Sequence, residues 1–420
     1  MRFSRTMNLL IHHIKELVTV RTEGAPTLTG ARMRDLGILH NASVIVRDGL
    51  IHWVGPSQDL PAADADDLPL IDASSRVALP GFVDAHTHLV FAGHRDEEFS
   101  MRAAGLSYQE IAQRGGGILN TVEPTRRATK KELKRSAARV LDNLMRHGTT
   151  TVEIKSGYGL DPESETKMME VITDLSAEHL ITVVRTFLGA HAVPPEHRSD
   201  PEAYVALVIE RMLPYVVRRN LADFCDVFCE RGYFTVDQSR RILSSARSLG
   251  LKLKIHADEL APSGGSELAA ELGTVSADHL EHISETGIAR LRQSGVVAVV
   301  LPGVSFFLNH GYAPARTLID EGVPLAIASD FNPGSCMSFS MPMMMTIACT
   351  HMHMSPEESI AATTINAAAA VGLSDRIGSI EPGKEADIVL YDIPNYRHLA
   401  YHFGMNHAAT IIKRGTILEF

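Results

Sequence analysis

The sequence has few cysteines, no excess of positive charge and no long uninterrupted apolar run. Four cysteines cannot cross-link a chain of 420 residues, and Cys225 and Cys229 lack a second matching pair for a structural zinc site. We therefore expect packed thiols and a reducing compartment. The formal net charge of -10 argues against a nucleic-acid partner, because nucleic-acid surfaces need clustered Lys and Arg.

The N-terminal stretch of residues 1–20 is apolar in places, but histidines and charged side chains interrupt it and no small-residue cleavage site follows. It therefore supports neither a signal peptide nor a membrane span. We predict a cytoplasmic protein without a membrane partner. With 420 residues, of which 45% are hydrophobic, the chain is long enough for one large core and a smaller accessory core.

Eight short runs rich in β-branched residues alternate with helix-like stretches. The runs cover residues 82–88, 149–155, 181–188, 223–229, 252–256, 274–279, 296–301 and 323–330. This alternation predicts an α/β protein built on a (β/α)8 TIM-like barrel, which we place at residues 79–374. Residues 1–78 and 375–420 contain further strand-like pieces. Since neither half has enough strands to bury a face alone, we predict one smaller β-sandwich domain formed from both termini.

Polar side chains stand where the eight runs end. In chain order, the main ones are His86 and His88, Lys155 and Tyr158, His191, Glu230, His256, His279, and Asp330. The strand ends of such a barrel converge at its C-terminal mouth, where barrel enzymes carry their active sites. We therefore expect these side chains to form one site.

His86 and His88 are the most informative of these residues. Side chains two apart on a strand point to the same face, so both imidazoles can bind one ion. With His256 and Asp330 they offer three nitrogen ligands and one oxygen ligand, which suits one zinc or iron ion and disfavours Mg²⁺. Water activated by such a metal becomes a nucleophile near neutral pH, and this predicts hydrolysis.

Neighbouring residues have several possible roles. Asp330 is also a candidate general base, whereas His279 shares that role, polarises a carbonyl or is a core histidine. Glu259 either contacts a substrate ring nitrogen or lies on the surface. Arg95 either binds a substrate carboxylate or pairs with one of the two acidic residues that follow it.

With HTH, HADE, ADHLEH and SDFNPGS in this order, the chain resembles the amidohydrolase superfamily of metal-dependent hydrolases and deaminases on a (β/α)8 barrel. VALPGFVDAHTH and GSIEPGKEADIVLYD are similar to the superfamily's entry to and exit from the barrel. Over essentially the whole chain, motifs such as EIKSGYGL, FLGAHAVPPE and ASDFNPGS resemble members that act in histidine degradation. The resemblance implies that water opens the cyclic amide of 4-imidazolone-5-propanoate and gives N-formimidoyl-L-glutamate.

The resemblance also implies roles for individual residues. The metal ligands, for one zinc or iron ion, match the four residues His86, His88, His256 and Asp330. The substrate contacts match Arg95, Tyr108, Tyr158, His191 and Glu259. The residues around the reacting ring match Glu259 and His279, and a loop that holds substrate or product matches Asn332, Gly334 and Ser335. Some superfamily members bridge a second metal with a carboxylated lysine or a glutamate, for which Lys155 and Glu230 are the candidates here. We expect one metal per chain and an unmodified Lys155.

Two other functions remain compatible with these residues. A deaminase of the cytosine or guanine type would use the metal, Glu259 and Asp330 equally well, and ammonia release would distinguish it. A metal-dependent binding protein without catalysis is the other alternative, because a fold does not by itself imply activity. Both enzyme hypotheses predict a small-molecule substrate. A homodimer is the expected assembly, because two-fold dimers are the commonest oligomers.

Overall fold

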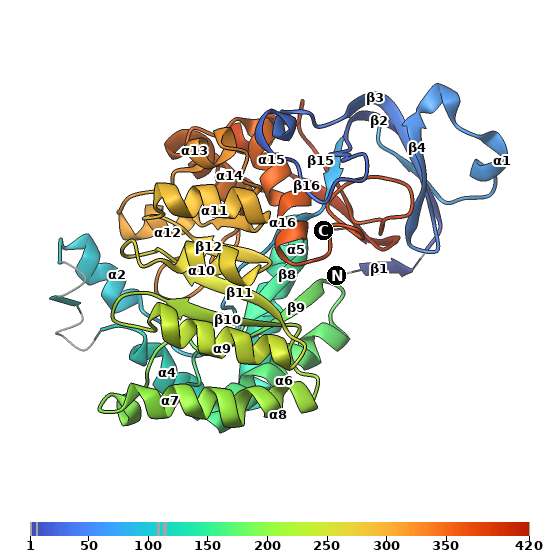
Figure 1. Ribbon diagram of the computed structural model, residues 1–420. Coiled ribbons are helices and arrows are strands. Elements are labelled where there is room, and N and C mark those ends of the chain that lie inside the picture. The colour runs from blue at the N-terminus through green and yellow to red at the C-terminus, as the bar shows by residue number, and fades with distance from the viewer. Residues whose placement is uncertain (1, 6, 107–109, 112–115, 420) are drawn as a thin grey trace.

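A computed structural model describes residues 2–5, 7–106, 110–111 and 116–419, so the predicted substrate contact Tyr108 lies outside the described residues. The chain forms an eight-stranded sheet and a nine-stranded sheet. In Figure 1 helices surround the first sheet, and the second stands beside it, where N-terminal (blue) and C-terminal (red) strands lie together. The predicted barrel with a smaller domain from both termini is confirmed.

The eight-stranded sheet is parallel, and each strand lies in or near a predicted run. Its strands are β7 (Phe82–Asp84), β8 (Thr149–Lys155), β9 (Thr182–Ala190), β10 (Phe224–Cys229), β11 (Lys252–Ala257), β12 (Ser276–His279), β13 (Val297–Val300) and β14 (Leu325–Ile327). Nearly all their side chains are buried, because helices cover the outside of the sheet and side chains fill its interior. The first run, predicted as residues 82–88, ends as β7 at Asp84, so His86 and His88 follow the strand and do not lie on it.

Several barrel helices begin with side chains that cap free backbone N–H groups. Thr129 and Glu132 form a reciprocal capping box at α5, and Asp161 accepts a hydrogen bond from the backbone of Ser164 at α6. The helices that accompany the barrel are α2 (Asp96–Ala103), α4 (Leu119–Arg127), α5 (Lys130–Arg146), α6 (Pro162–Glu178), η3 (Pro195–His197), α7 (Pro201–Leu207), the π-helical η4 (Val208–Met212), α8 (Leu213–Arg218), α9 (Val236–Ser248), α10 (Gly265–Leu272), α11 (Glu285–Ser294), α12 (Pro302–Leu308), α13 (Ala315–Asp320), α14 (Met341–His351), α15 (Pro356–Thr363) and α16 (Ile365–Ala370).

The barrel closes between β14 and β7 through the predicted metal-binding segments. The backbone N–H of Asp330 donates to the carbonyl of His86 at 3.0 Å, and that of His88 donates to the carbonyl of Phe331 at 2.9 Å. Thr87 and Phe331 pair as an isolated parallel bridge. The bonds that close the barrel therefore also bring the side chains of its first and last strand ends together.

The nine-stranded sheet combines strands from both ends of the chain. Its strands are β1 (Arg2–Arg5), β2 (Leu9–Val18), β3 (Ile38–Arg47), β4 (Leu50–Pro56), β5 (Leu70–Asp72), β6 (Val77–Pro80), β15 (Ile388–Tyr391), β16 (Ala408–Lys413) and β17 (Thr416–Glu419). Because β1 pairs with β17, the two ends lie side by side (Figure 1). Where we predicted a sandwich, one continuous sheet holds a single core with buried residues from β2, β3, β4, β6, β15 and β16.

Short helices lie in the connections of the terminal domain: η1 (Gly30–Arg34), η2 (Ser57–Asp59), α1 (Ala62–Ala65) and α17 (His398–Tyr401). β6 spans the first predicted domain boundary, and Val18, Val20 and Met33 pack in the barrel core. The strand and these core contacts cross the predicted boundary, so they do not mark where one domain ends. The division into residues 1–78 plus 375–420 and residues 79–374 stays a prediction.

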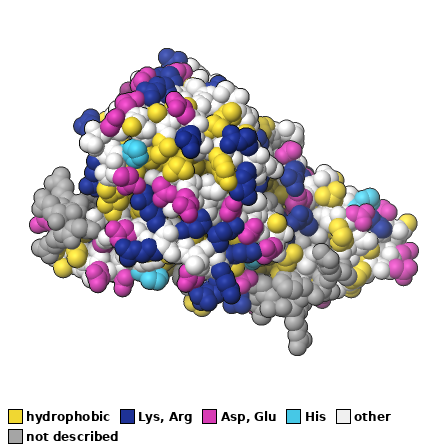
Figure 2. Space-filling view, turned by 90° about the horizontal axis from the view of Figure 1, so that it is seen from below, with side chains coloured by type: hydrophobic (Ala, Val, Ile, Leu, Met, Phe, Trp, Pro, Cys, Tyr) yellow, Lys and Arg dark blue, Asp and Glu magenta, His cyan; other side chains and the backbone are white. Residues whose placement is uncertain are grey.

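Three features of the described residues bear on the sequence analysis. Within the described ranges, no helix combines the length and the apolar character that a membrane crossing requires. On the face shown in Figure 2, basic and acidic side chains are interspersed. All four cysteines are free, and Cys225, Cys229 and Cys336 are buried, as expected for packed thiols.

Candidate active site

Three ligand atoms converge where the barrel closes. His86 Nε2 lies 3.3 Å from His88 Nε2, and both nitrogens lie 3.4 Å from Asp330 Oδ1. Ligand atoms held tetrahedrally at about 2.0–2.1 Å from zinc are roughly 3.3–3.4 Å apart. This triangle therefore has the size that one first-row divalent ion requires, and all three side chains are buried.

His256 is placed to add a fourth ligand to this triangle. Its ring centroid lies 4.6 Å from that of His86 and 5.5 Å from that of His88. His256 Nε2 and Asp330 Oδ1 are buried and have no hydrogen-bond partner in the described part of the chain. A bound cation would satisfy both atoms, so these residues fit the predicted metal. Burial also lowers the pKa values of His86 and His88, which keeps both rings neutral, as metal ligation requires.

Two aspartates that the sequence analysis missed orient the histidine rings. His86 Nδ1 donates to Asp278 Oδ2 at 2.6 Å, and Asp226 Oδ2 lies 3.1 Å from His256 Nδ1. Carboxylates in this position fix the ring tautomer and leave Nε2 for a metal. Both aspartates lie inside fully buried strands, β12 and β10. For Asp226, the signal that could have identified it was a charged residue within the apolar strand Phe224–Cys229.

Lys155 and Glu230, the candidates for a second metal, are engaged by other groups. Lys155 Nζ lies 2.8 Å from Glu153 Oε1 and 2.9 Å from Asp226 Oδ2. Burial alone would lower the pKa of Lys155, but the surrounding carboxylates outweigh it and raise the pKa, so the side chain is an ammonium. Glu230 Oε2 accepts a hydrogen bond from the backbone of Leu260 at 2.9 Å. One metal and an unmodified Lys155 stay the prediction.

The loop after β14 orients the carboxylate of Asp330. Asn332 Nδ2 donates to Asp330 Oδ2 at 2.7 Å, and Ser335 Oγ donates to the same oxygen at 3.0 Å. Asn332 Oδ1 in turn accepts from the backbone of Gly334 and Ser335 at 2.7 and 2.9 Å. Asp330 itself has a φ of 50°, a left-handed conformation that is costly for a non-glycine residue. The predicted loop residues therefore hold Asp330 in a strained but defined orientation.

His279 lies between two carboxylates at the end of β12. Its Nε2 is 3.6 Å from Glu259 Oε2, and its Nδ1 is 3.7 Å from the carboxylate of Glu281, which the sequence analysis missed. Burial lowers the pKa of His279, but the two carboxylates outweigh this effect and raise it. Burial raises the pKa of Glu259 to about 7. With a side chain only 13% exposed, Glu259 is not a surface glutamate.

A cavity of about 740 Å³ brings the predicted site residues together. Those that line it are His88, Arg95, Tyr158, His191, His256, Glu259, His279, Asp330, Asn332, Gly334 and Ser335. His86 is completely buried. A cavity of this size accommodates a small molecule.

Two guanidinium groups line the cavity. Arg95 donates to both carboxylate oxygens of Glu98, at 3.0 and 2.7 Å, and not to either of the residues that directly follow it. Arg102, on α2, was not predicted; it lies over Phe307, 5.1 Å from the ring centroid. Its Nε is buried without a hydrogen-bond partner among the residues described. Glu98 balances the charge of Arg95, so the positive charge that remains in this part of the cavity comes from Arg102.

His191 and Tyr158 form an aromatic wall of the cavity. His191 Nδ1 donates to the carbonyl of Gly157 at 2.9 Å, so the neutral ring offers Nε2 as an acceptor. Burial lowers the pKa of His191 to about 3, which keeps the ring neutral. The His191 ring stacks on His88 at a centroid distance of 5.0 Å, and the Tyr158 ring lies 5.4 Å from it.

Comparison with known proteins identifies the family. Residues 77–418 match the amidohydrolase family. The chain is 50% identical to the imidazolonepropionase of Geobacillus kaustophilus over 413 residues, which cover 98% of this chain and 97% of that protein. It is also 50% identical to the imidazolonepropionase of Parabacteroides distasonis over 410 residues, with 97% of this chain and 98% of that protein covered.

Two zinc-containing enzymes share the fold. An adenosine deaminase from Xanthomonas campestris with bound zinc has a TM-score of 0.70 at 21% identity, covering 97% of this chain and 92% of that one. An atrazine chlorohydrolase from Arthrobacter aurescens complexed with zinc has a TM-score of 0.71 at 16% identity, covering 98% and 95%. On the family match, the fold and the close relatives together, the chain belongs to the amidohydrolase family and, within it, to the imidazolonepropionases.

Proposed function

We propose that this chain opens the ring of 4-imidazolone-5-propanoate with water to give N-formimidoyl-L-glutamate, a step of histidine degradation. The observation that carries the proposal is a metal-sized ligand triangle in a cavity that also holds two guanidinium groups. Hydrolysis of the cyclic amide needs the metal that the triangle would hold, and recognition of the substrate carboxylate needs the guanidinium groups. Relatives about 50% identical over nearly the whole chain carry the name of this activity.

One divalent ion would be held by His86, His88, His256 and Asp330. The nitrogen and oxygen donors suit zinc or iron. Zinc is bound in the two enzymes of similar fold. When bound, the ion supplies Lewis acidity, which activates water as a nucleophile near neutral pH.

Asp330 accepts the proton that the attacking water loses. Its Oδ2 is engaged by Asn332 and Ser335, whereas its Oδ1 faces the site without a hydrogen-bond partner among the described residues. His279, whose pKa is raised by its two carboxylate neighbours, carries a proton and polarises the carbonyl oxygen of the ring. This division of roles makes Asp330, rather than His279, the first proton acceptor.

Glu259 donates a proton to the ring nitrogen that leaves. The water oxygen bonds to the carbonyl carbon, the carbon–nitrogen bond of the ring breaks, and the nitrogen needs a proton to depart as a neutral group. Because burial raises the pKa of Glu259 to about 7, part of the population carries this proton at neutral pH. The products are a carboxylate and a protonated former ring nitrogen, so the atoms of substrate and water are conserved.

Arg95 and Arg102 bind the propionate carboxylate of the substrate. Arg95 is fixed in place by its two hydrogen bonds to Glu98, and a Cβ at position 334 would collide with its Nη1, which explains Gly334. Two guanidinium groups facing one carboxylate give charge-assisted hydrogen bonds of defined direction. On the aromatic wall, His191 Nε2 accepts a hydrogen bond from a ring N–H, and the Tyr158 hydroxyl contacts the ring.

The test is to incubate the metal-loaded enzyme with freshly prepared substrate, identify the product by mass spectrometry and assay ammonia. We expect substrate plus one water molecule and no ammonia. Ammonia release from a purine or pyrimidine would instead support a deaminase. A metal-loaded protein that is inert toward all these compounds would support a binding protein. The cytoplasmic location and the homodimer stay predictions.

A further inference from the structure

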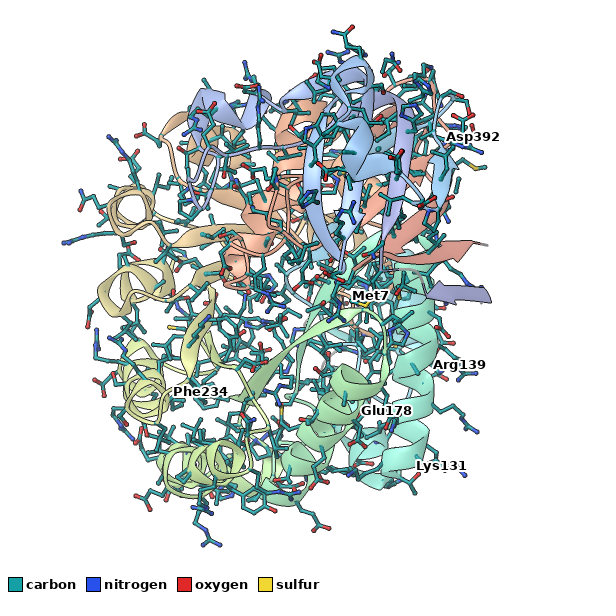
Figure 3. All side chains as sticks on the ribbon, turned by 90° about the vertical axis from the view of Figure 1, so that its right-hand side faces the viewer. Met7, Lys131, Arg139, Glu178, Phe234 and Asp392 are labelled. Atoms are coloured by element: carbon teal, nitrogen blue, oxygen red, sulfur yellow. The ribbon has the colours of Figure 1, made fainter. Side chains whose placement is uncertain are left out.

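A second histidine cluster lies on the terminal domain, far along the chain from the barrel ligands. It consists of His398, His402 and His407, which we call the surface cluster, and each residue offers a ring nitrogen within 4.8 Å of the others. His398 and His407 are half-buried and His402 is exposed. Asp392, which is labelled at the outer edge of the molecule in Figure 3, donates its backbone N–H to the carbonyl of His407. The surface cluster therefore lies next to this labelled residue.

The rings of the surface cluster are as close to one another as the metal-binding histidines of the barrel. Ring centroids are 5.1, 5.5 and 4.8 Å apart in the surface cluster. The corresponding distances among His86, His88 and His256 are 5.2, 4.6 and 5.5 Å. The two clusters therefore place three imidazoles at the same spacing.

The backbone holds the surface cluster in this arrangement. The N–H of His402, the residue that follows α17, donates to the carbonyl of His398 at 2.9 Å, so the two residues stand one helical turn apart. The buried side chain of Leu399 anchors α17, and Thr346 Oγ1 donates to the carbonyl of Ala400 at 2.8 Å. His407 is fixed directly before β16. The backbone therefore keeps the three ring nitrogens within 4.8 Å of one another.

The ring nitrogens of the surface cluster are also available. His407 Nε2 is buried and has no hydrogen-bond partner within the described ranges. The nearby carboxylate of Asp392 pairs with Arg76 at 2.8 Å and does not bond to a cluster ring among the residues described. Three imidazoles that form no hydrogen bond to a carboxylate in the described part of the chain suit a borderline first-row divalent cation, and zinc accepts three histidines with water in the fourth position.

We propose that His398, His402 and His407 bind one zinc ion at the surface, in addition to the ion of the barrel. The site joins the end of α17 to the residue before β16 and leaves one coordination position open to solvent. It does not contribute to the ring-opening reaction. The expectation of one metal per chain then applies to the barrel alone.

The test is to strip the full-length protein of metal, dialyse it against Zn²⁺ and measure the zinc content per chain. The wild type is expected to bind two equivalents. His402→Ala and His398→Gln are each expected to bind one and to retain full turnover when loaded. His88→Ala is expected to bind one equivalent without turnover. His52→Ala, which removes another exposed histidine of the terminal domain, serves as the matched control and should bind two.

The proposal is overturned if His402→Ala and His398→Gln bind as much zinc as the wild type, whatever the wild-type count. It is also overturned if His52→Ala loses an equivalent in the same way, because binding would then not depend on the cluster. Ring opening is measured separately, so failure of the surface site leaves the proposed function untouched. Failure of the proposed function likewise leaves the difference in zinc content between the wild type and His402→Ala unchanged.

Discussion

The three barrel histidines that we propose as metal ligands and the three histidines of the surface cluster have similar spacing, but their surroundings differ. His86, His88 and His256 are buried, and carboxylates contact the outer nitrogens of His86 and His256. The surface cluster is partly exposed, and within the described residues no carboxylate bonds to its rings. Because buried, oriented ligands bind a metal more tightly, the barrel should hold its ion in preference to the surface.

The two sites also differ in the groups that could take part in catalysis. The barrel site lies beside a cavity with a carboxylate ligand, a buried glutamate and two guanidinium groups. The surface cluster has none of these groups at hydrogen-bond distance from its rings among the residues described. We therefore expect three histidines to suffice for binding an ion, whereas catalysis depends on the groups that surround them.

The largest expected effect is that of His88→Ala. Removing one of the ligands of the buried triangle should release the barrel ion, and kcat/KM should fall roughly ten-thousandfold or more, since the metal contributes several kcal/mol. Steady-state kinetics and zinc analysis measure both effects. A variant that retains wild-type turnover would remove His88 from the metal site, and His402→Ala, with full turnover expected, is the control.

Glu259→Gln should keep the barrel ion and lose most turnover. The amide cannot deliver a proton to the leaving nitrogen, so kcat should fall about a hundredfold to a thousandfold, within the usual range for general acid catalysis. Zinc content and kcat measured on the same preparation separate this loss from loss of metal. If kcat stays at the wild-type value, Glu259 has no part in the chemistry.

Asp278→Asn tests the orienting carboxylate, the feature that the surface cluster lacks. Loss of the charge that His86 Nδ1 faces should weaken zinc binding at the barrel roughly 10–100-fold. Competition with a zinc chelator measures the affinity. Asp392→Asn, next to the surface cluster, is the matched control and should leave both sites unchanged. Equal affinities in Asp278→Asn and wild type would show that burial alone makes the difference.

Arg102→Ala should weaken substrate binding rather than the chemical step. A hydrogen bond to a charged group contributes about 1.5–3 kcal/mol, so KM should rise roughly 10–100-fold with a smaller change in kcat. Arg127→Ala removes an arginine whose side chain is 80% exposed and should leave KM unchanged. An unchanged KM in Arg102→Ala would leave carboxylate recognition to Arg95 alone.

The smallest effect is expected for His402→Ala on stability. An exposed substitution outside a packed core usually changes the free energy of unfolding by no more than about 0.5 kcal/mol. In metal-free protein, thermal melting of the variant should therefore match wild type. A large decrease in melting temperature would mean that the His402 side chain contributes to packing, which would argue against a role as a metal ligand.

Much of the fold could be predicted because each barrel strand is a short apolar run bounded by helix signals. β8 occupies residues 149–155, as predicted. The last run, predicted to extend to residue 330, ends as β14 at Ile327. Asp330 adopts a φ of 50°, which is incompatible with a strand, and residue periodicity carries no sign of this.

The candidate site was predictable where it depended on strand ends and not where it depended on contacts between strands. His86, His88, His256 and Asp330 follow from position and residue type. Their partners do not, because the bond between His86 and Asp278 joins residues 192 positions apart. The local partner of Arg95 was also missed, since one helical turn of α2 brings Glu98, rather than an adjacent acidic residue, to its guanidinium.

The sequence by itself determined the alternation of strands and helices and the chemical type of each ligand, because both are encoded in local residue patterns. Only the tertiary structure decided which atoms meet. Barrel closure sets the 3.4 Å between the His86 and Asp330 ligand atoms, which come from the first and last strand ends of the barrel. Such distances depend on the packing of elements far apart in the chain, so they appear only once the chain is folded.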